Sequence, residues 1–255
     1  MPLYRLFFRL SVFLVFLLMV ATGVSVQAQR HRPRLPRTIM ARPDMPFVYF
    51  PYPLGKKRWM GSLGLAFTVP PRAVTEEFQV TVPRSDLTVL RGLSKHIYLS
   101  ARLTAQGLQN HLSIGPRYAR PVSERISLSI GDDFGLWGGI LRSSQFNSQG
   151  FGLLNYPTVS LGYQVDPQLL LTLKAEVILN LYNFSKVGQV ATKTNAMQLE
   201  GAGVTMAMEQ PFYGRKHVLL GFRALYTNFN WQFWALFPTF DRRLFYPELF
   251  IGFYL

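Results

Sequence analysis

The residues best suited to chemistry lie on two neighbouring stretches in the middle of the chain. His111 and Ser113 are two positions apart, so both side chains point to one face of an extended strand. Asp132 and Asp133 follow in the next stretch of alternating polarity. A base beside a hydroxyl and a carboxylate can activate a nucleophile or a water molecule. Because a His-x-Ser pair also arises by chance on strands, we predict no catalytic residue here.

Other reactive motifs are missing from the sequence. The 255 residues contain no cysteine, which excludes disulfides and thiolate metal sites. The sequence shows no metal-ligand spacing, phosphate-binding loop or nucleophile elbow. We therefore expect no cofactor and no bound metal.

Polar and apolar residues alternate along most of residues 59–255, as in strands with one apolar face. The longest such stretch, Thr158 to Tyr182, is broken only at Asp166-Pro167, which predicts a β-hairpin. Each arm is long enough to cross a bilayer, for which about 9–11 tilted residues suffice. Connections near 93, 122, 166 and 213 are short, and those near 144, 189 and 236 are long, although the one near 108 is short too. This pattern predicts an all-β, antiparallel up-and-down transmembrane barrel of ten strands, or of eight if residues 59–90 stay outside the wall.

Composition favours a membrane barrel over a soluble one. Charged residues make up 16% of the chain, against about 25% in soluble domains. Aromatic residues reach 15% and gather where strands meet loops, as in interfacial girdles. A membrane barrel turns its polar set inward, and mixed signs predict buried ion pairs more than an open pore. The predicted lumen charge network is Arg102, Arg117, Arg125, Asp133, Lys174, Glu176, Arg223 and Glu248.

The N-terminal region differs from the rest of the chain. Residues 1–28 read as a signal peptide, with Arg5 and Arg9 before an apolar core and Val26-Gln27-Ala28 before the cut. Residues 29–58 carry six prolines and a net charge of +7. This composition predicts a disordered periplasmic arm, which either contacts anionic lipid or serves as a solvated linker.

A second unusual segment is the aromatic loop after Asn228. It contains Trp231, Phe233, Trp234 and Phe237, close together in the sequence. Two interpretations are open: an extension of the interfacial girdle, or a surface patch that contacts glycan, lipid or a protein.

Residues 59–255 resemble the small outer-membrane β-barrel proteins of Gram-negative bacteria. The final Leu249-x-Ile251-x-Phe253-x-Leu255 is similar to the terminal signal read by the barrel-assembly machinery, and Tyr52 to Trp59 is similar to a segment in uncharacterised members. The resemblance implies export through the inner membrane and insertion in the outer membrane. Outer-membrane lipid and the assembly machinery are then the expected partners, and nucleic acid is not.

The resemblance carries no activity with it. The leading hypothesis is a non-enzymatic barrel with a structural or surface-binding role. The alternatives are a narrow channel for small solutes and a lipid A-modifying or other envelope enzyme.

Overall fold

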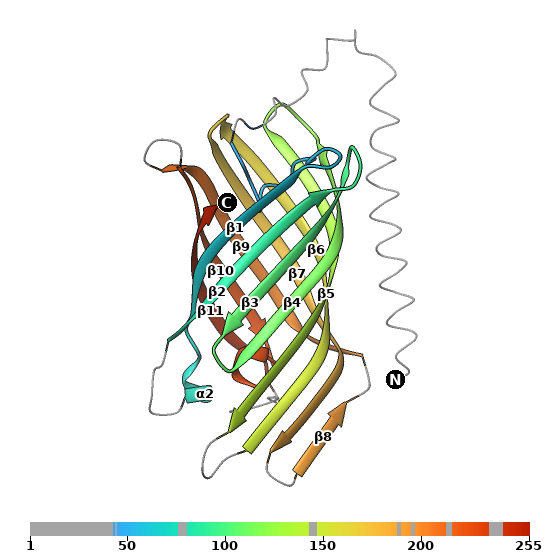
Figure 1. Ribbon diagram of the computed structural model, residues 1–255, viewed down its shortest axis with the longest axis vertical. Coiled ribbons are helices and arrows are strands. Elements are labelled where there is room, and N and C mark those ends of the chain that lie inside the picture. The colour runs from blue at the N-terminus through green and yellow to red at the C-terminus, as the bar shows by residue number, and fades with distance from the viewer. Residues whose placement is uncertain are drawn as a thin grey trace. The chain divides into compact units, whose positions relative to one another are not determined.

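The protein forms a closed antiparallel barrel in the computed structural model, which describes residues 43, 45–75, 81–142, 147–187, 190–194, 197–212, 216–234 and 242–255 (Figure 1). The predicted signal peptide and the first half of the predicted basic arm, up to residue 42, lie outside these residues. The ten wall strands are β1 (Trp59–Thr68), β2 (Val82–Gly92), β3 (Ile97–Gln106), β4 (Gln109–Pro121), β5 (Ile126–Arg142), β6 (Asn147–Asp166), β7 (Leu169–Val187), β9 (Gln198–Phe212), β10 (Lys216–Thr227) and β11 (Leu244–Tyr254).

The first and last strands close the barrel. β1 pairs with β11 from Ser62–Tyr254 to Thr68–Glu248, and β6 pairs with β7 to complete the ring. β8 (Val190–Thr194) pairs with β7 alone, so it is an extension and not part of the wall. The predicted ten-stranded barrel is confirmed, and the eight-stranded alternative is wrong because β1 and β2 belong to the wall.

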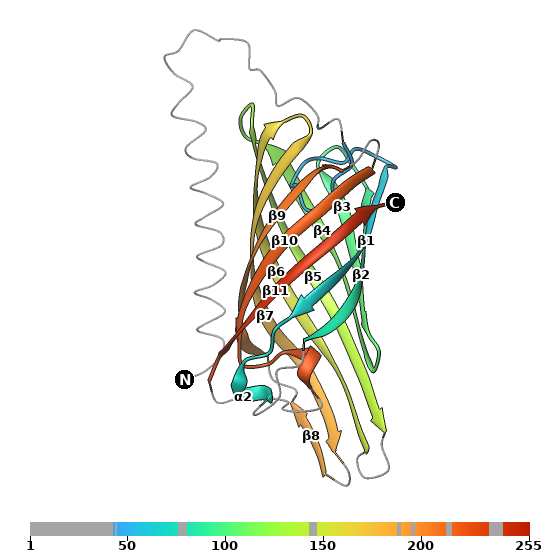
Figure 2. The same ribbon diagram turned by 90° about the vertical axis from the view of Figure 1, so that its left-hand side faces the viewer.

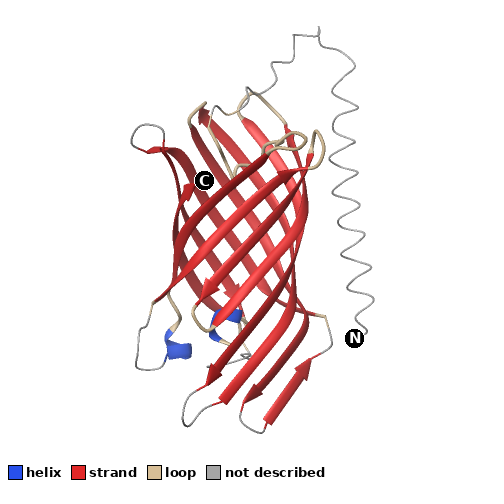
Figure 3. Ribbon diagram, viewed as in Figure 1, coloured by secondary structure: helices blue, strands red, loops and turns tan. Residues whose placement is uncertain are grey.

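Helix is almost absent from the described residues (Figure 3). It is confined to the four-residue α2 (Arg72–Thr75) and the 3-10 turn η1 (Trp231–Phe233). None of the helical segments in this part of the chain is long and apolar enough to cross a membrane.

Side chains alternate between an apolar outer face and a polar inner face along the wall. On β5, Ile130 and Phe134 are more than half exposed, whereas Ser129 and Asp133 are buried. On the outer face of β11, Leu249 is 61% exposed, and its inner neighbour Glu248 is 1% exposed. Leucine and phenylalanine in such numbers on an outer surface fit contact with lipid tails.

One charged residue interrupts the apolar band in the described part of the wall. Asp132 lies on the outer face of β5, between Ile130 and Phe134. Its Oδ1 accepts a hydrogen bond of 2.6 Å from Nδ2 of Asn155 on β6. Because this partner lies on the same face, the carboxylate is not left unsatisfied among apolar side chains.

The two ends of the barrel differ in construction. The short-turn rim carries the β2–β3, β4–β5 and β6–β7 turns, the N-terminal end of β1 and the C-terminal end of β11. Side chains within these turns accept hydrogen bonds from the turn backbone. In the β6–β7 turn, Oδ1 of Asp166 accepts from the backbone N–H groups of Gln168 and Leu169. The long-loop rim carries α2 and η1, and there β5 to β8 continue past the rest of the wall (Figure 2). Residues 143–146, 188–189, 213–215 and 235–241 of the predicted connections lie outside the described residues.

Residues 45–54 do not follow the prediction of a disordered arm. Phe47, Phe50 and Leu54 are at most 2% exposed and pack against the inner face near the short-turn rim. Their neighbours there include Leu90 of β2 and Leu170 of β7. We call residues 45–54 the N-terminal plug, because they fill this end of the barrel.

Candidate functional site in the barrel lumen

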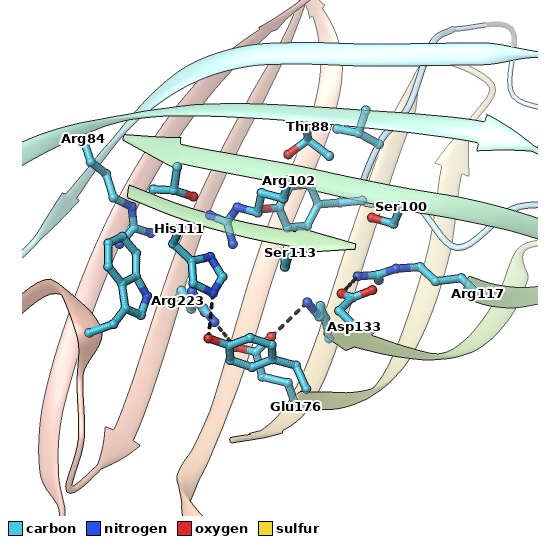
Figure 4. Close-up of a pocket in the computed structure, with 16 residues that line it drawn as sticks. Arg84, Thr88, Ser100, Arg102, His111, Ser113, Arg117, Asp133, Glu176 and Arg223 are labelled. Atoms are coloured by element: carbon cyan, nitrogen blue, oxygen red, sulfur yellow. Dashed lines mark hydrogen bonds and ion pairs between the residues drawn. The ribbon is translucent and has the colours of Figure 1, made fainter. Parts of the chain in front are cut away.

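A cavity of about 60 Å³ lies in the lumen (Figure 4). Val48 and Tyr49 of the N-terminal plug line it, as does Trp231 of η1. The remaining lining comes from inward-facing side chains of β2 to β7 and β10, which alternation places in the lumen. A cavity of this size has room for a few water molecules, since one needs about 10–15 Å³ on this measure.

Ion pairs connect the strands around this cavity. Arg84 pairs with Glu248, Arg102 with Asp86, and Arg117 with Asp133. Glu176 pairs with two cations, Lys174 at 2.9 Å and Arg223. Each pair joins different strands except Lys174–Glu176, so the network ties distant parts of the wall together. A buried charge without a partner is strongly unfavourable, which explains why opposite charges occur together here.

The structure brings most of the predicted charge network into the lumen. Arg102, Arg117, Asp133, Lys174, Glu176, Arg223 and Glu248 all take part in the ion pairs described above. Arg125 does not, because it is exposed in the β4–β5 turn of the short-turn rim. The sequence analysis missed Arg84 and Asp86. The spacing of Arg84 and Asp86 follows the alternation of a strand. The start of β2 was not recognised because of Pro83, which lies opposite Phe67 near the end of the β1–β2 pairing.

His111 and Ser113 both face the lumen, as their spacing predicts. Nε2 of His111 lies 3.0 Å from the Tyr156 hydroxyl, and its ring stacks on Trp231 with 5.0 Å between centroids. Among the described side chains, no hydrogen bond joins His111 to Ser113 or Asp133. The imidazole therefore has a packing role between two aromatic rings.

The N-terminal plug is held by one carboxylate that the sequence analysis did not single out. Glu209 on β9 is completely buried. Its Oε1 accepts from the backbone N–H groups of Val48 at 2.7 Å and Tyr49 at 3.1 Å, and Oε2 accepts from that of Phe50 at 2.8 Å. The Tyr254 hydroxyl donates to the same carboxylate. Four donors around one carboxylate satisfy a buried charge without a basic residue.

Aromatic contacts complete the seat of the N-terminal plug. Tyr49 stacks on Phe250 of β11 with 5.3 Å between centroids, and Phe47 meets Tyr52 edge to face. The Ser127 hydroxyl donates to the carbonyl oxygen of Pro51. Burial raises the pKa of the Tyr49 phenol above its usual range, so this side chain stays neutral.

The other end of the barrel is filled by residues 229–234, which we call the loop plug. Trp234 is 1% exposed and lies 6.1 Å from the ring of Trp137. Gly150 leaves room for it, because a Cβ there would lie 2.8 Å from the Trp234 ring. Phe233 stacks on Tyr246 of β11 at 5.7 Å. The aromatic segment therefore folds inward at Phe233 and Trp234 and is not a surface patch there, while Phe237 lies outside the described residues.

We expect Asn230→Ala to loosen the loop plug. Oδ1 of Asn230 accepts from the backbone N–H of Gln232 at 3.1 Å and caps η1. Losing such a cap costs about 1 kcal/mol. The measurement is the temperature at which half of the protein no longer migrates on a gel as the folded barrel, and this temperature should be lower in the variant. Asn110→Ala, at an exposed position, is the matched control. Equal midpoints for both variants would contradict the capping role.

No protein-family model and no curated protein matches this sequence. Solved structures with a similar trace include the KdgM porin in complex with disordered oligogalacturonate, at 12% identity and a TM-score of 0.35, covering 76% of this chain and 97% of that one. The translocator domain of autotransporter NalP from Neisseria meningitidis is 8% identical with a TM-score of 0.44, and the match covers 77% of this chain and 87% of that one. The toluene transporter TbuX from Ralstonia pickettii is 10% identical with a TM-score of 0.38, and the match covers 86% of this chain and 83% of that one.

The wall itself carries the assignment of the fold. Its ten strands close on themselves, their outer face is apolar, and their inner face holds buried ion pairs. A soluble barrel has the opposite arrangement, with its apolar face inside. The chain therefore has the fold of the small outer-membrane β-barrels.

Proposed function

We propose that this protein is a non-enzymatic outer-membrane barrel with a structural or surface-binding role. The single observation behind the proposal is that both ends of the lumen are filled by the chain's own residues. The N-terminal plug places Phe47 and Phe50 at one end, and the loop plug places Phe233 and Trp234 at the other. Export through the inner membrane and insertion through the C-terminal strand, Leu249 to Leu255, belong to the same proposal.

A filled lumen argues against a narrow channel as the resting state. Eight to ten strands enclose a space that side chains can largely fill. Here the central space is only about 60 Å³, and buried ion pairs from opposite sides surround it. A solute would have to displace apolar side chains at both ends before it crossed the barrel.

The enzyme alternative has less support. Catalysis by His111 would need a hydrogen bond to the group that it activates. In the described residues the imidazole instead lies between Tyr156 and Trp231, behind the loop plug. Phe233 and Trp234 belong to the buried apolar cluster at this end of the lumen, and a lipid substrate entering there would have to displace them.

A surface-binding role is supported by an aromatic cluster on β6 and β7, near the long-loop rim. Phe151 lies close to Tyr182 and Phe184, with centroids 5.6 and 5.3 Å apart. Lys193 of β8 places its ammonium 5.7 Å from the Tyr182 ring. Aromatic rings beside a cation form a surface that can bind anionic or glycan ligands.

Single-channel recording tests the proposal directly. We expect the purified, folded full chain to show no unitary conductance in planar bilayers, because both plugs are in place. The control is a variant that lacks residues 45–54 and carries Phe233→Gly and Trp234→Gly, which opens both ends. Heat-modifiable migration must first show that both proteins form barrels. Steady unitary currents from the full chain would overturn the proposal in favour of the channel.

A further inference from the structure

The cavity in the lumen has a mainly cationic wall. Only two of the described carboxylates, Asp133 and Glu176, line it. The carboxylates that pair with Arg84 and Arg102 lie outside the lining. Five positively charged residues face the cavity: Arg84, Arg102, Arg117, Lys174 and Arg223.

The ion pairs leave one positive charge without a carboxylate of its own. Within the described network, four carboxylates serve five cations. The imbalance is at Glu176, which both Lys174 and Arg223 contact. An excess charge in a buried site is unfavourable until a counter-charge joins it.

Three of the cations also lie close to one another. The guanidinium groups of Arg84, Arg102 and Arg223 interact electrostatically with each other and with His111. Figure 4 shows these arginine side chains reaching toward the His111 ring. In a medium of low dielectric constant, these like charges repel one another. A negative charge between them would convert the repulsion into attraction.

Neutral hydrogen-bond donors complete the lining. The hydroxyl side chains of Thr88, Ser100, Thr104 and Ser113 all face the cavity. Guanidinium groups and hydroxyls together can satisfy a ligand that only accepts hydrogen bonds. The volume of about 60 Å³ restricts that ligand to a few heavy atoms.

We propose that this cavity binds one small monovalent anion, of the size of chloride or formate, beside Arg84, Arg102 and Arg223. The anion neutralises the excess charge and stabilises the three guanidinium groups where they converge. Asp133 does not oppose binding, because Arg117 neutralises it. This site goes beyond the proposed structural or surface-binding role, and it exists whether or not the lumen conducts.

Chloride binding to the folded wild-type chain is the first test. The full chain in a zwitterionic detergent is dialysed against radioactive chloride. In a second measurement, the temperature at which half of the protein loses the gel migration of the folded barrel is compared between sodium chloride and sodium gluconate of equal ionic strength. Gluconate is too large for the cavity. We expect about one chloride per chain and a midpoint a few degrees higher in chloride, because a ligand that binds only the folded state stabilises it. No retained chloride together with equal midpoints would show that the cavity holds only water.

A charge-neutralising variant is the second test. Lys174→Met removes the excess cation and leaves Glu176 paired with Arg223. We expect it to bind chloride about tenfold more weakly than the wild type. Lys95→Met, which removes an exposed cation on the short-turn rim, should bind as the wild type does. Equal affinity in the two variants would overturn the proposal. If Lys174→Met does not form a barrel, the salt comparison on the wild type decides alone.

Discussion

Glu176→Ala is expected to leave most of the protein unable to form a stable barrel. The substitution removes the carboxylate that pairs with both Lys174 and Arg223, so two buried cations lose their partner at once. Breaking a buried pair by removing one partner costs about 3–5 kcal/mol. Folded proteins have a total stability of about 5–15 kcal/mol, so this loss is a large part of it. The fraction of refolded protein with heat-modifiable gel migration measures the effect.

Two comparisons separate this effect from a general loss of acidic charge. Glu124→Ala removes an exposed glutamate from the β4–β5 turn and should refold like the wild type. In Glu176→Ala, a second substitution, Lys174→Met, removes one unpaired cation and should restore part of the refolded fraction. If Glu176→Ala refolds as fully as Glu124→Ala, the ion pairs contribute little to stability.

Glu209→Ala is expected to release the N-terminal plug while the wall stays closed. Three backbone N–H groups, of Val48, Tyr49 and Phe50, donate to this carboxylate, and the variant leaves them without an acceptor. A hydrogen bond to a charged group contributes about 1.5–3 kcal/mol. Losing even one of them raises the population of the released plug about tenfold or more. Chymotrypsin cleavage after Phe47, which is nearly inaccessible in the wild type, reports the release.

A conservative substitution sharpens this experiment. Glu209→Gln keeps one acceptor oxygen in place of two, so its cleavage rate should fall between those of the wild type and Glu209→Ala. Heat-modifiable migration should be the same for all three proteins. Equal cleavage rates would mean that the apolar contacts of Phe47 and Phe50 hold the plug without the carboxylate.

The wall could be predicted from sequence because its signal is local. Strand alternation repeats every two residues, and lipid demands that it hold along each strand. The break at Asp166-Pro167 marked the hairpin, and β6 indeed ends at Asp166 while β7 begins at Leu169. The same period placed Asp133 inside, where the structure pairs it with Arg117, and the structure leaves Asp132 outside with Asn155.

The plugs could not be predicted, because their structure depends on contacts with distant parts of the chain. Residues 45–54 are rich in proline and lack periodicity, so on their own they read as a disordered arm. Glu209 lies about 160 residues away, on a strand of small residues whose inner face the sequence did not reveal. The inward fold of Trp234 likewise requires space beside Gly150, on β6. Packing, and not local preference, decides the position of both segments.

The pairing of β1 with β11 sets the order of events during biogenesis. Thr68 hydrogen-bonds to Glu248, 180 positions further along the polypeptide. The barrel therefore cannot close until β11 is present, and a chain without β11 exposes the unpaired edges of β1 and β10. Such edges recruit other strands and lead to aggregation. We therefore expect a chain truncated before Leu244, which lacks all of β11, to fail to close its barrel and to be degraded faster than the full chain.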